Sequence, residues 1–303
     1  MTTINRAVIS NLLLPGAHAV FANYNIYPAQ WKEIYTPYTS NKAIEYEIQT
    51  SELGPAQMRP EGSPTYLDDM KEVFTSRYEH LAYAIGFQIT RFAIEDNLYK
   101  DQFPKQMLNL RNSLETVKNV NGANLFNNAF NLNSAGSDGL PMLSTQHPTK
   151  YGVLANTFNN FVGLNESSLE EMITIVKGWT GYSGLKTNTN TIKILTGQSL
   201  AFSASRLLNS QYRIGTTNND INVIAHDKYM PGGSVVNQFI QNPNAWFVLT
   251  DEPNGFKYFS RTKLDIDFLT DTMTNNVTVC AMERYSMGFS NWRAVAGSIG
   301  VGA

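Results

Sequence analysis

The chain has 303 residues, of which 42% are hydrophobic and 16% are charged, so it can bury one large core or two moderate ones without disulfides or metals. Its formal net charge of −2, from 23 basic and 25 acidic residues, excludes a protein that grips nucleic acid through many phosphate contacts, since that needs a clustered excess of Lys and Arg. The single cysteine, Cys280, excludes a disulfide framework and suits a reducing cytoplasm, and no apolar run approaches the roughly 18 residues of a membrane span.

Residues 1–40 carry few charges and several helix-breaking residues, with aromatic side chains between them. The aromatic residues of this segment are Phe21, Tyr24, Tyr27, Trp31, Tyr35 and Tyr38. Because a solitary domain has little reason to keep an extended aromatic arm exposed, we expect the segment to lie along another molecule. The alternative is an arm that packs on the core of its own chain, since large aromatic side chains bury themselves wherever they can.

Residues 42–50 alternate between apolar and polar side chains in the manner of a strand. A tip rich in Pro and Gly follows at 54–64, and residues 71–90 form a second strand-prone run. The sequence therefore predicts a long two-stranded excursion with a loose tip. An isolated hairpin of this length is marginal in water and its unpaired edges invite other strands, so we expect neighbouring chains to cover it.

The pattern becomes helical after Arg91, with a short helix predicted near 92–100 and a long one from about 104 to 128. Proline is accepted in the first turn of a helix but is damaging further inside, so Pro104 is expected to mark the start of the long helix. An apolar stripe along this helix is formed by Met107, Leu110, Leu114, Val117 and Leu125. The sequence thus predicts a long helix with one buried face.

The rest of the chain predicts a compact mixed domain followed by a β-rich segment. Helices are expected at 167–179 and 198–208, and strands at 191–195, 221–225, 246–250, 256–261, 264–269 and 276–285. The first of these helices has a start signal in the hydroxyl of Ser167 or Ser168. The sequence contains no internal repeat, which excludes solenoids and repeat arrays.

Catalytic or metal chemistry finds little support in the residue pattern. The histidines stand far apart without metal-ligand spacing, at His18, His80, His147 and His226. Ser144 lies near His147, and Ser183 lies in a Gly-Tyr-Ser-Gly run, but neither matches the Gly-x-Ser-x-Gly elbow of hydrolases. We therefore predict no catalytic, cofactor-binding or metal site. A hydrolase with a convergent site in the middle domain is an alternative that spacing alone leaves open.

Two stretches of the sequence carry a resemblance to a known family. The first is Asn-Leu-Phe-Asn-Asn-Ala-Phe at 124–130, with Ser-Asp-Gly-Leu-Pro-Met-Leu-Ser-Thr-Gln-His-Pro at 137–148. The second is Trp-Phe-Val-Leu-Thr-Asp at 246–251, followed by Phe-Lys-Tyr-Phe at 256–259, Glu-Arg-Tyr-Ser at 283–286 and Asn-Trp-Arg at 291–293. In these stretches, and in the order of its elements, the chain resembles the major capsid proteins of tailed bacteriophages, the Hong Kong 97 fold group, and within it the Mu-like major head subunits.

The resemblance implies an α+β capsid fold with an N-terminal arm, an extended β-hairpin loop, a peripheral domain with a long spine helix, and a mixed α/β axial domain. The implied boundaries are 1–40 for the arm, 41–90 for the loop, 91–165 and 256–287 for the peripheral domain, 166–255 for the axial domain and 288–303 for a C-terminal return to the axial domain. By analogy this return places Trp292 in the core of the axial domain.

The same resemblance implies a structural role and no enzymatic activity. Copies of the chain are expected to form the pentamers and hexamers of an icosahedral shell around double-stranded DNA, in a virion assembled in the cytoplasm of a host bacterium. An encapsulin-like shell protein, which has the same fold and encloses other cargo, is the alternative. A tail or decoration protein fits less well, because those are dominated by β structure and this chain predicts a spine-like helix.

The residues expected at contacts between subunits are Tyr24, Tyr27, Trp31, Met58, Arg59, Tyr66 and Arg77. Packing inside the subunit is the alternative for the two arm aromatics Tyr27 and Trp31, and a solvated charge is the alternative for Arg59. The chain has no long acidic or coiled N-terminal segment to act as a built-in scaffold, so a separate scaffolding protein is expected, with a portal and room for a decoration protein. Weak, nonspecific contact with packaged DNA and no covalent cross-links are also expected.

Overall fold

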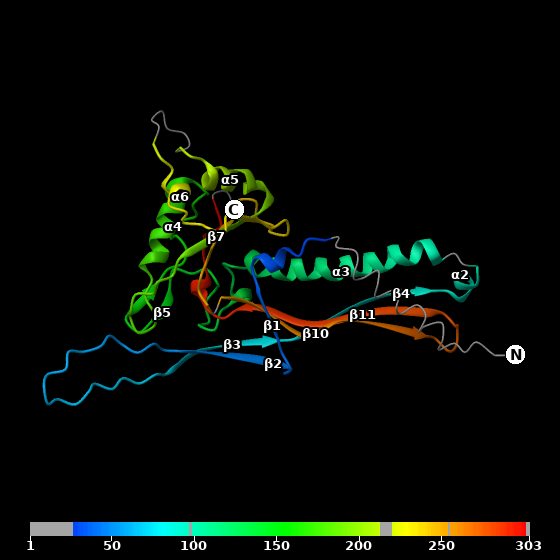
Figure 1. The fold of residues 1–303 in the computed structure, drawn as a ribbon, viewed down its shortest axis with the longest axis horizontal. Helices are drawn as coiled ribbons and strands as arrows, with labels where there is room; N and C mark the ends of the chain where they lie inside the picture. Colours follow the sequence, from blue (N-terminus) through cyan, green and yellow to red (C-terminus); the bar gives the residue numbers. More distant parts are fainter. Residues whose placement is uncertain (1–26, 97–98, 213–219, 254, 301–303) are drawn as a thin grey trace.

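The computed structural model describes residues 27–96, 99–212, 220–253 and 255–300. Figure 1 shows three parts: a long sheet with a helix lying along it, a compact mixed unit at one end of the sheet, and a hairpin that projects beneath the mixed unit. One hydrophobic cluster joins the mixed unit to the near end of the long sheet, and a second lies under the helix. The chain therefore has the α+β architecture that was expected.

The long sheet has the strand order β1-β10-β11-β4. Its strands are β1 (Thr36–Thr39), β10 (Phe256–Thr270), β11 (Val277–Phe289) and β4 (Leu81–Ile89). β1 runs parallel to β10, and the other neighbours are antiparallel. The prediction of two separate strands, at 256–261 and 264–269, is wrong, because β10 is continuous. Two register shifts interrupt its alternation of inward and outward side chains, which made it look like two strands. Segments from both ends of the chain build this one sheet.

A long helix covers one face of this sheet. After α2 (Arg91–Glu95), the chain enters α3 (Tyr99–Asn127). The prediction that Pro104 marks its start is wrong, because the helix begins earlier and Pro104 lies inside it. A proline there forfeits one backbone hydrogen bond, and the burial of Phe103 and Met107 against the sheet offsets that loss. Met107, Leu110 and Leu114 of the predicted buried face are buried against the sheet, whereas Val117 and Leu125 are only partly buried.

The hairpin is a two-stranded antiparallel ribbon of β2 (Ile44–Thr50) and β3 (Glu72–Glu79). The prediction that its second strand continues to residue 90 is wrong: the run is broken at His80, and the next strand joins the long sheet instead. Both ring nitrogens of His80 lie 3.0 Å from serine hydroxyls, those of Ser40 and Ser286. This buried corner redirects the chain, so the projecting part is shorter than the sequence pattern indicates.

The mixed unit is built on a sheet of order β12-β9-β7-β8. Its strands are β7 (Thr191–Thr196), β8 (Ser234–Val236), β9 (Trp246–Thr250) and β12 (Val295–Ser298), and its helices are α4 (Glu166–Gly178), α5 (Ala201–Asn209) and α6 (Val223–His226). The short elements are η1 (Gln30–Glu33), η2 (Leu132–Ser134), η3 (Gln198–Leu200), η4 (Trp292–Ala294), β5 (His147–Thr149) and β6 (Gly152–Leu154). The chain re-enters this unit after β11, and Trp292 is buried in its core.

Capping residues explain two differences from the predicted elements. α4 begins after Asn165 rather than after a serine: the Asn165 side chain accepts a hydrogen bond from the Ser168 amide at 2.8 Å, and the Ser168 hydroxyl accepts one from the Asn165 amide at 3.0 Å. The predicted strand at 221–225 is wrong, because Asn222 caps the start of the short helix α6. The Asn222 side chain also donates to the Leu207 carbonyl at 2.7 Å, which fixes α6 against α5.

Candidate interaction surface

The hairpin tip, residues 51–71, carries large apolar side chains with little cover. The exposed fractions are 91% for Met58, 86% for Leu67 and 64% for Met70. The tip extends past the paired part of the ribbon and away from the rest of the chain (Figure 1). A soluble monomer rarely gathers apolar side chains at the end of a projecting loop, so the tip is a candidate surface for another chain.

Three of the predicted contact residues lie in this tip. Met58 and Tyr66 are exposed, with 57% of Tyr66 accessible. Arg59 is also exposed, and its Nε donates to the carbonyl of Ser63 at 2.6 Å, a contact within the tip itself. All three side chains lie outside the core, as contacts between subunits require, and their partner stays a prediction.

The root of the hairpin is fixed to the long sheet by buried polar contacts. The Lys257 ammonium forms an ion pair with the Glu47 carboxylate, and the Ser290 hydroxyl donates to the same carboxylate at 2.9 Å. The phenol oxygen of Tyr78 lies 2.5 Å from that hydroxyl, and burial raises the pKa of Tyr78, so the phenol stays neutral. These four groups hold β2 and β3 against β10 and β11, so the tip is presented in a fixed direction.

A second anchor ties the hairpin to the mixed unit. The Ser183 hydroxyl donates to the backbone carbonyl of Glu52, and the rings of Phe74 and Tyr182 meet edge to face at 6.2 Å. The Gly-Tyr-Ser-Gly run singled out in the sequence is therefore a docking loop for the hairpin.

Arg77 lies on the exposed side of β3 and forms a surface ion pair. Its Nη2 is 2.9 Å from Oε2 of Glu79, and the two side chains are 55% and 58% exposed. Exposed pairs of this kind stabilise a fold by about 0–1 kcal/mol. Arg77 therefore contributes little inside the subunit and stays available to a neighbour.

We expect Arg77→Ala to change the free energy of unfolding of the subunit by less than about 1 kcal/mol in urea titrations. If Arg77 meets another subunit, the same variant lowers the yield of assembled particles while the unassembled subunit keeps its stability. Glu79→Ala is the matched control, since it removes the same ion pair and keeps the arginine. A larger loss of stability in Arg77→Ala than in Glu79→Ala would assign Arg77 a role within the subunit.

The aromatic residues of the arm divide between surface and core. Tyr24 lies outside the described residues, and Tyr27 is 38% exposed and available to a neighbour. Trp31 is only 5% exposed. Its indole Nε1 donates to Glu115 at 2.7 Å, and its ring centroid lies 4.3 Å from that of Tyr258. The expectation that Trp31 meets another subunit is contradicted, because α3 and β10 of its own chain cover it.

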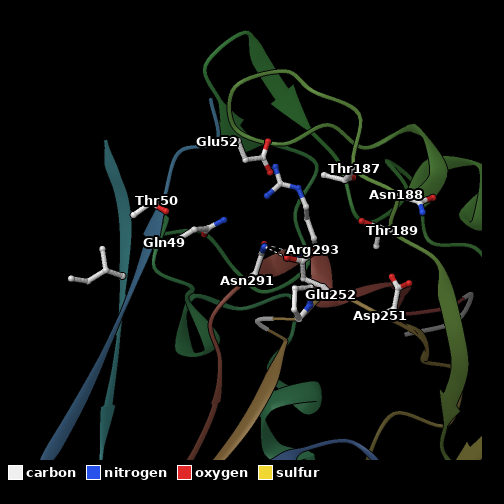
Figure 2. A pocket seen from close by; sticks show the side chains of 12 residues that line it. Gln49, Thr50, Glu52, Thr187, Asn188, Thr189, Asp251, Glu252, Asn291 and Arg293 are labelled. Atoms are coloured by element: carbon white, nitrogen blue, oxygen red, sulfur yellow. Dashed lines mark hydrogen bonds between the residues drawn. The ribbon is translucent and has the colours of Figure 1, made fainter. Parts of the chain in front are cut away.

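A polar pocket of about 420 Å³ lies between the hairpin and the mixed unit (Figure 2). Glu52, Glu252 and Arg293 are among its lining residues, and Asn291 donates to Oε1 of Glu252 at 2.9 Å. Burial raises the pKa of Glu252 and lowers that of Arg293. The described residues that line it include three threonines and the carboxylates of Glu52, Asp251 and Glu252, and none of them is Ser, Cys, His or Lys.

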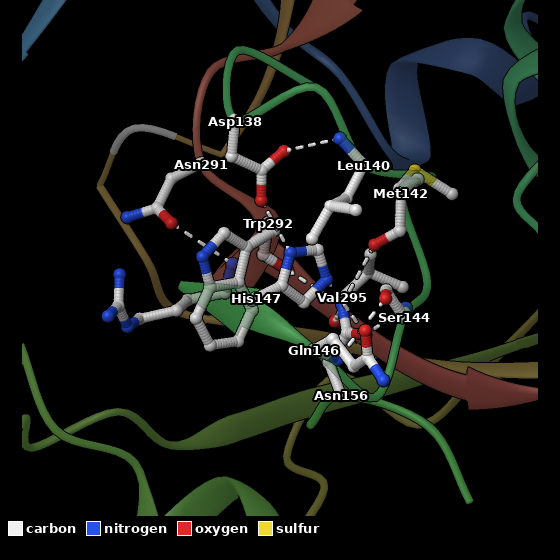
Figure 3. Close-up of polar contacts among 11 residues, drawn as sticks. Asp138, Leu140, Met142, Ser144, Gln146, His147, Asn156, Asn291, Trp292 and Val295 are labelled. Atoms are coloured by element: carbon white, nitrogen blue, oxygen red, sulfur yellow. Dashed lines mark hydrogen bonds and ion pairs between the residues drawn. The ribbon is translucent and has the colours of Figure 1, made fainter. Parts of the chain in front are cut away.

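Ser144 and His147, the other pair that could suggest catalysis, belong to a polar network around the buried His147 ring (Figure 3). Nδ1 of His147 lies 2.6 Å from Oδ2 of Asp138, a contact that catalytic triads share. Its Nε2, however, faces Oδ1 of Asn156 at 3.2 Å, and Ser144 Oγ accepts from the Gln146 amide at 3.2 Å. The histidine is not aimed at the serine, so this network does not activate a nucleophile.

The described part of the chain offers neither a metal centre nor a membrane-spanning helix. Within its ranges, no group of three or more His, Cys, Asp or Glu side chains is placed to hold a metal ion. None of the helices described there combines the length and the apolar character that a bilayer crossing requires. Cys280 is partly buried on β11.

No protein-family model and no curated protein sequence matches the chain. The capsid of an empty GTA particle, computed with C5 symmetry, matches with a TM-score of 0.54 at 11% identity over 90% of each chain. The procapsid of bacteriophage JBD30, computed in I4 symmetry, gives a TM-score of 0.53 at 15% identity, over 97% of this chain and 76% of the other. This chain has the capsid fold. Microbacterium phage Oxtober96 gives a TM-score of 0.52 at 11% identity, over 91% and 93%.

The capsid fold confirms, at the level of architecture, the resemblance seen in the sequence. The sequence predicted the exposed hairpin tip. It did not predict the residues that fix the direction of the hairpin, above all Glu47 and Lys257. The signal for Lys257 was a lone charge inside the aromatic run at 256–259, where a buried partner is required. Leu67 and Met70 were also missed, although large apolar residues in a loop rich in Pro and Gly are themselves a signal of a contact surface.

Proposed function

We propose that this chain is the major capsid subunit of a tailed bacteriophage, and that its copies form the pentamers and hexamers of an icosahedral shell around double-stranded DNA. The observation that carries the proposal is the capsid fold combined with a firmly held hairpin whose tip exposes Met58, Leu67 and Met70. In a closed symmetric shell the same surface meets an equivalent partner in every copy. Covering the tip removes apolar surface from water, which is worth about 25 cal/mol per Å².

In this proposal the activity is structural and not enzymatic. The two serines that raised the question of catalysis have structural partners: Ser183 donates to a carbonyl of the hairpin, and Ser144 accepts from a neighbouring amide. The described lining of the polar pocket between hairpin and mixed unit contains no Ser, Cys, His or Lys side chain. These contacts and the capsid fold favour the structural role over the hydrolase alternative.

The division into capsid domains is part of the proposal. The regions are an arm at 1–40, an extended loop at 41–90, a peripheral domain at 91–165 and 256–287, an axial domain at 166–255 and a C-terminal return at 288–303. The pairing of β4 with β11 favours moving residues 81–89 from the loop to the peripheral domain. The burial of Trp292 beside Trp179, with ring centroids 5.3 Å apart, supports the C-terminal return.

Other partners complete the proposal. A separate scaffolding protein, a portal and a decoration protein are proposed partners of the shell, which is assembled in the host cytoplasm and becomes part of the virion. The similarity to a procapsid structure supports a precursor shell. The formal charge of −2 supports weak, nonspecific contact with packaged DNA.

The test is electron cryomicroscopy and sedimentation of the full-length chain, expressed alone and together with its neighbouring genes. We expect closed icosahedral shells, or free pentamers and hexamers, whose subunits separate fully in boiling detergent because no cross-links join them. A uniform monomer or dimer under every condition would contradict the proposal. Shells that enclose a cargo protein instead of DNA would favour the encapsulin-like alternative.

A further inference from the structure

The long sheet ends on one side in an open strand edge. In the order β1-β10-β11-β4, the last strand pairs with β11 along one edge, and no strand among the described residues pairs with its other edge. An open edge offers a row of N–H and C=O groups to any strand that reaches it, and most folds protect such edges with charged side chains, Pro or a bulge. A long edge without these features is a surface on which another strand is expected.

β4 has none of these protective features. Its nine residues read Leu-Ala-Tyr-Ala-Ile-Gly-Phe-Gln-Ile, with no charged residue and no Pro. Its pairing with β11 has no register shift, so no bulge turns the edge away. Leu81 and Ile85 are 54% and 41% exposed, although α3 packs against this strand. The edge is therefore long, regular and apolar.

The sequence of β4 is nearly symmetric in side-chain size about Ile85. Side chains alternate between the two faces of a strand, and Tyr83, Phe87 and Ile89 are the ones that pack toward α3. If two copies of β4 run antiparallel with Ile85 opposite Ile85, large residues face large residues on the α3 side, and the other face is lined mainly by small ones. The opposed pairs are Leu81 with Ile89, Tyr83 with Phe87, Ala82 with Gln88 and Ala84 with Gly86.

The charges beyond the two ends of β4 fit the same register. It brings Glu79 of one copy toward Arg91 of the other, twice by symmetry, and both side chains are exposed. Opposite charges on neighbouring strands are favourable and like charges are unfavourable. A shift of two residues would bring Arg91 toward either Arg77 or Leu81 of the other copy. Charge complementarity therefore favours the register that is centred on Ile85.

We propose that β4 pairs with β4 of a second copy, antiparallel about a two-fold axis at Ile85, and joins the two four-stranded sheets into one. A two-fold contact uses the same surface on both copies, which a strand of symmetric sequence provides. The two α3 helices then lie on the same face of the joined sheet. One pair of strands is a smaller contact than the roughly 1,200 Å² of a standard interface, so free subunits associate weakly through it. The pairing needs two copies but no closed shell.

Disulfide formation between introduced cysteines tests this contact. Directly opposed residues in antiparallel strands have Cβ atoms about 4.5–5.5 Å apart, which a disulfide spans after a small adjustment. In the full-length chain with Cys280→Ser as background, Ile85→Cys is expected to give covalent dimers on mild oxidation, seen in non-reducing gels. Leu269→Cys is the matched control, because Leu269 is 59% exposed on β10 of the same sheet. It is expected to stay largely monomeric.

A mixing experiment tests the register. In the centred register the residue at position 82 faces position 88 of the other copy, and both positions are exposed, so a cysteine there leaves the core intact. Ala82→Cys alone and Gln88→Cys alone are each expected to give few dimers. An equal mixture of the two variants is expected to give several times more.

A charge at the axis tests the contact without chemical linkage. Ile85→Lys sets two ammonium groups against each other, and we expect it to raise the dissociation constant of unassembled subunits by about tenfold or more in sedimentation. Leu269→Lys adds the same charge to an exposed position away from the open edge, so it is expected to leave the dissociation constant unchanged.

Equal yields of dimer from Ile85→Cys and Leu269→Cys would overturn the proposal, as would dimers of Ala82→Cys alone at the yield of the mixture. Protection of every β4 amide from hydrogen exchange in the monomer would also overturn it, because another segment of the chain would then cover the edge. Closed shells whose subunits do not link at position 85 would overturn this pairing and leave the proposed function standing. Linked dimers that never form shells would support the pairing and contradict the proposed function.

Discussion

A chain in which residues 55–67 are replaced by a short Gly-Ser turn is expected to fold normally and to form no closed shells. The deleted segment makes local contacts, such as the bond from Arg59 to Ser63. The contact between the Gly54 amide and Asp68, at 2.7 Å, and the anchors at the root of the hairpin remain. Subunit stability should therefore be kept, while the exposed apolar tip is lost. Urea unfolding measures the first effect, and sedimentation with electron cryomicroscopy measures the second.

Two controls separate the chemistry of the tip from its length. A Gly-Ser segment of the natural length at 55–67 keeps the reach of the loop and removes its side chains, so it should also fail to assemble. Replacing Met58, Leu67 and Met70 by Ser keeps the backbone of the tip and isolates the apolar contribution; this variant should give fewer or weaker particles. Normal shells from the shortened chain would show that the hairpin tip is not an assembly surface.

Lys118→Met is expected to lower the free energy of unfolding of the subunit by about 3–5 kcal/mol at neutral pH. Nζ of Lys118 on α3 lies 2.7 Å from Oε2 of Glu283 on β11, and the Glu283 side chain is 3% exposed. The other Glu283 oxygen has no hydrogen-bond partner among the described residues. Removing the ammonium leaves a buried carboxylate without a counter-charge, a state that desolvation penalises strongly. Urea unfolding of the unassembled subunit measures the loss.

The pH dependence of this variant has a definite sign. Burial already raises the pKa of Glu283 in the folded chain, although Lys118 opposes the shift. The folded state thus holds the proton at higher pH than the unfolded state, so stability falls as pH rises through the folded pKa. The loss in Lys118→Met should be largest at neutral pH and shrink in acid. The double variant with Glu283→Gln should recover much of the stability; an equal loss at all pH values would contradict this account.

Elements with a strong local signal were predicted well from the sequence. The predicted strand at 246–250 has the same bounds in the structure. A short apolar run between two turns is too short for a helix, and as a buried strand it removes all its side chains from water. The buried face of α3 follows from its helical spacing. The break at His80 was missed, since the two strands beside it both alternate and differ only in their partners. The error at 221–225 also comes from a local pattern that fits two structures. The apolar residues there suit a strand, but the side chain of Asn222 caps a helix, and the helix forms.

The sequence predicted where the candidate surface lies, but not the contacts that hold the hairpin in place. Apolar residues such as Met58 in a loop rich in Pro and Gly indicate exposure by local chemistry alone. The pairing of Glu47 with Lys257 depends on a contact between distant parts of the chain, which no local pattern contains. The prediction that Trp31 contacts another subunit was wrong for the same reason. α3 and β10, which are distant from Trp31 in the sequence, cover its side chain.

The arrangement of the strands also affects how the chain is made. β1 and β4 from the first part of the chain pair with β10 and β11 from its last part. In the other large sheet, β9 pairs with β12, which is the last strand that the structure describes. Neither large sheet can close before the final strands have left the ribosome, and such long-range pairing is slow to form. A chain cut short during translation therefore lacks both finished sheets. In the proposed shell, synthesis of β11 and β12 would therefore precede the folding of a subunit that can meet its neighbours.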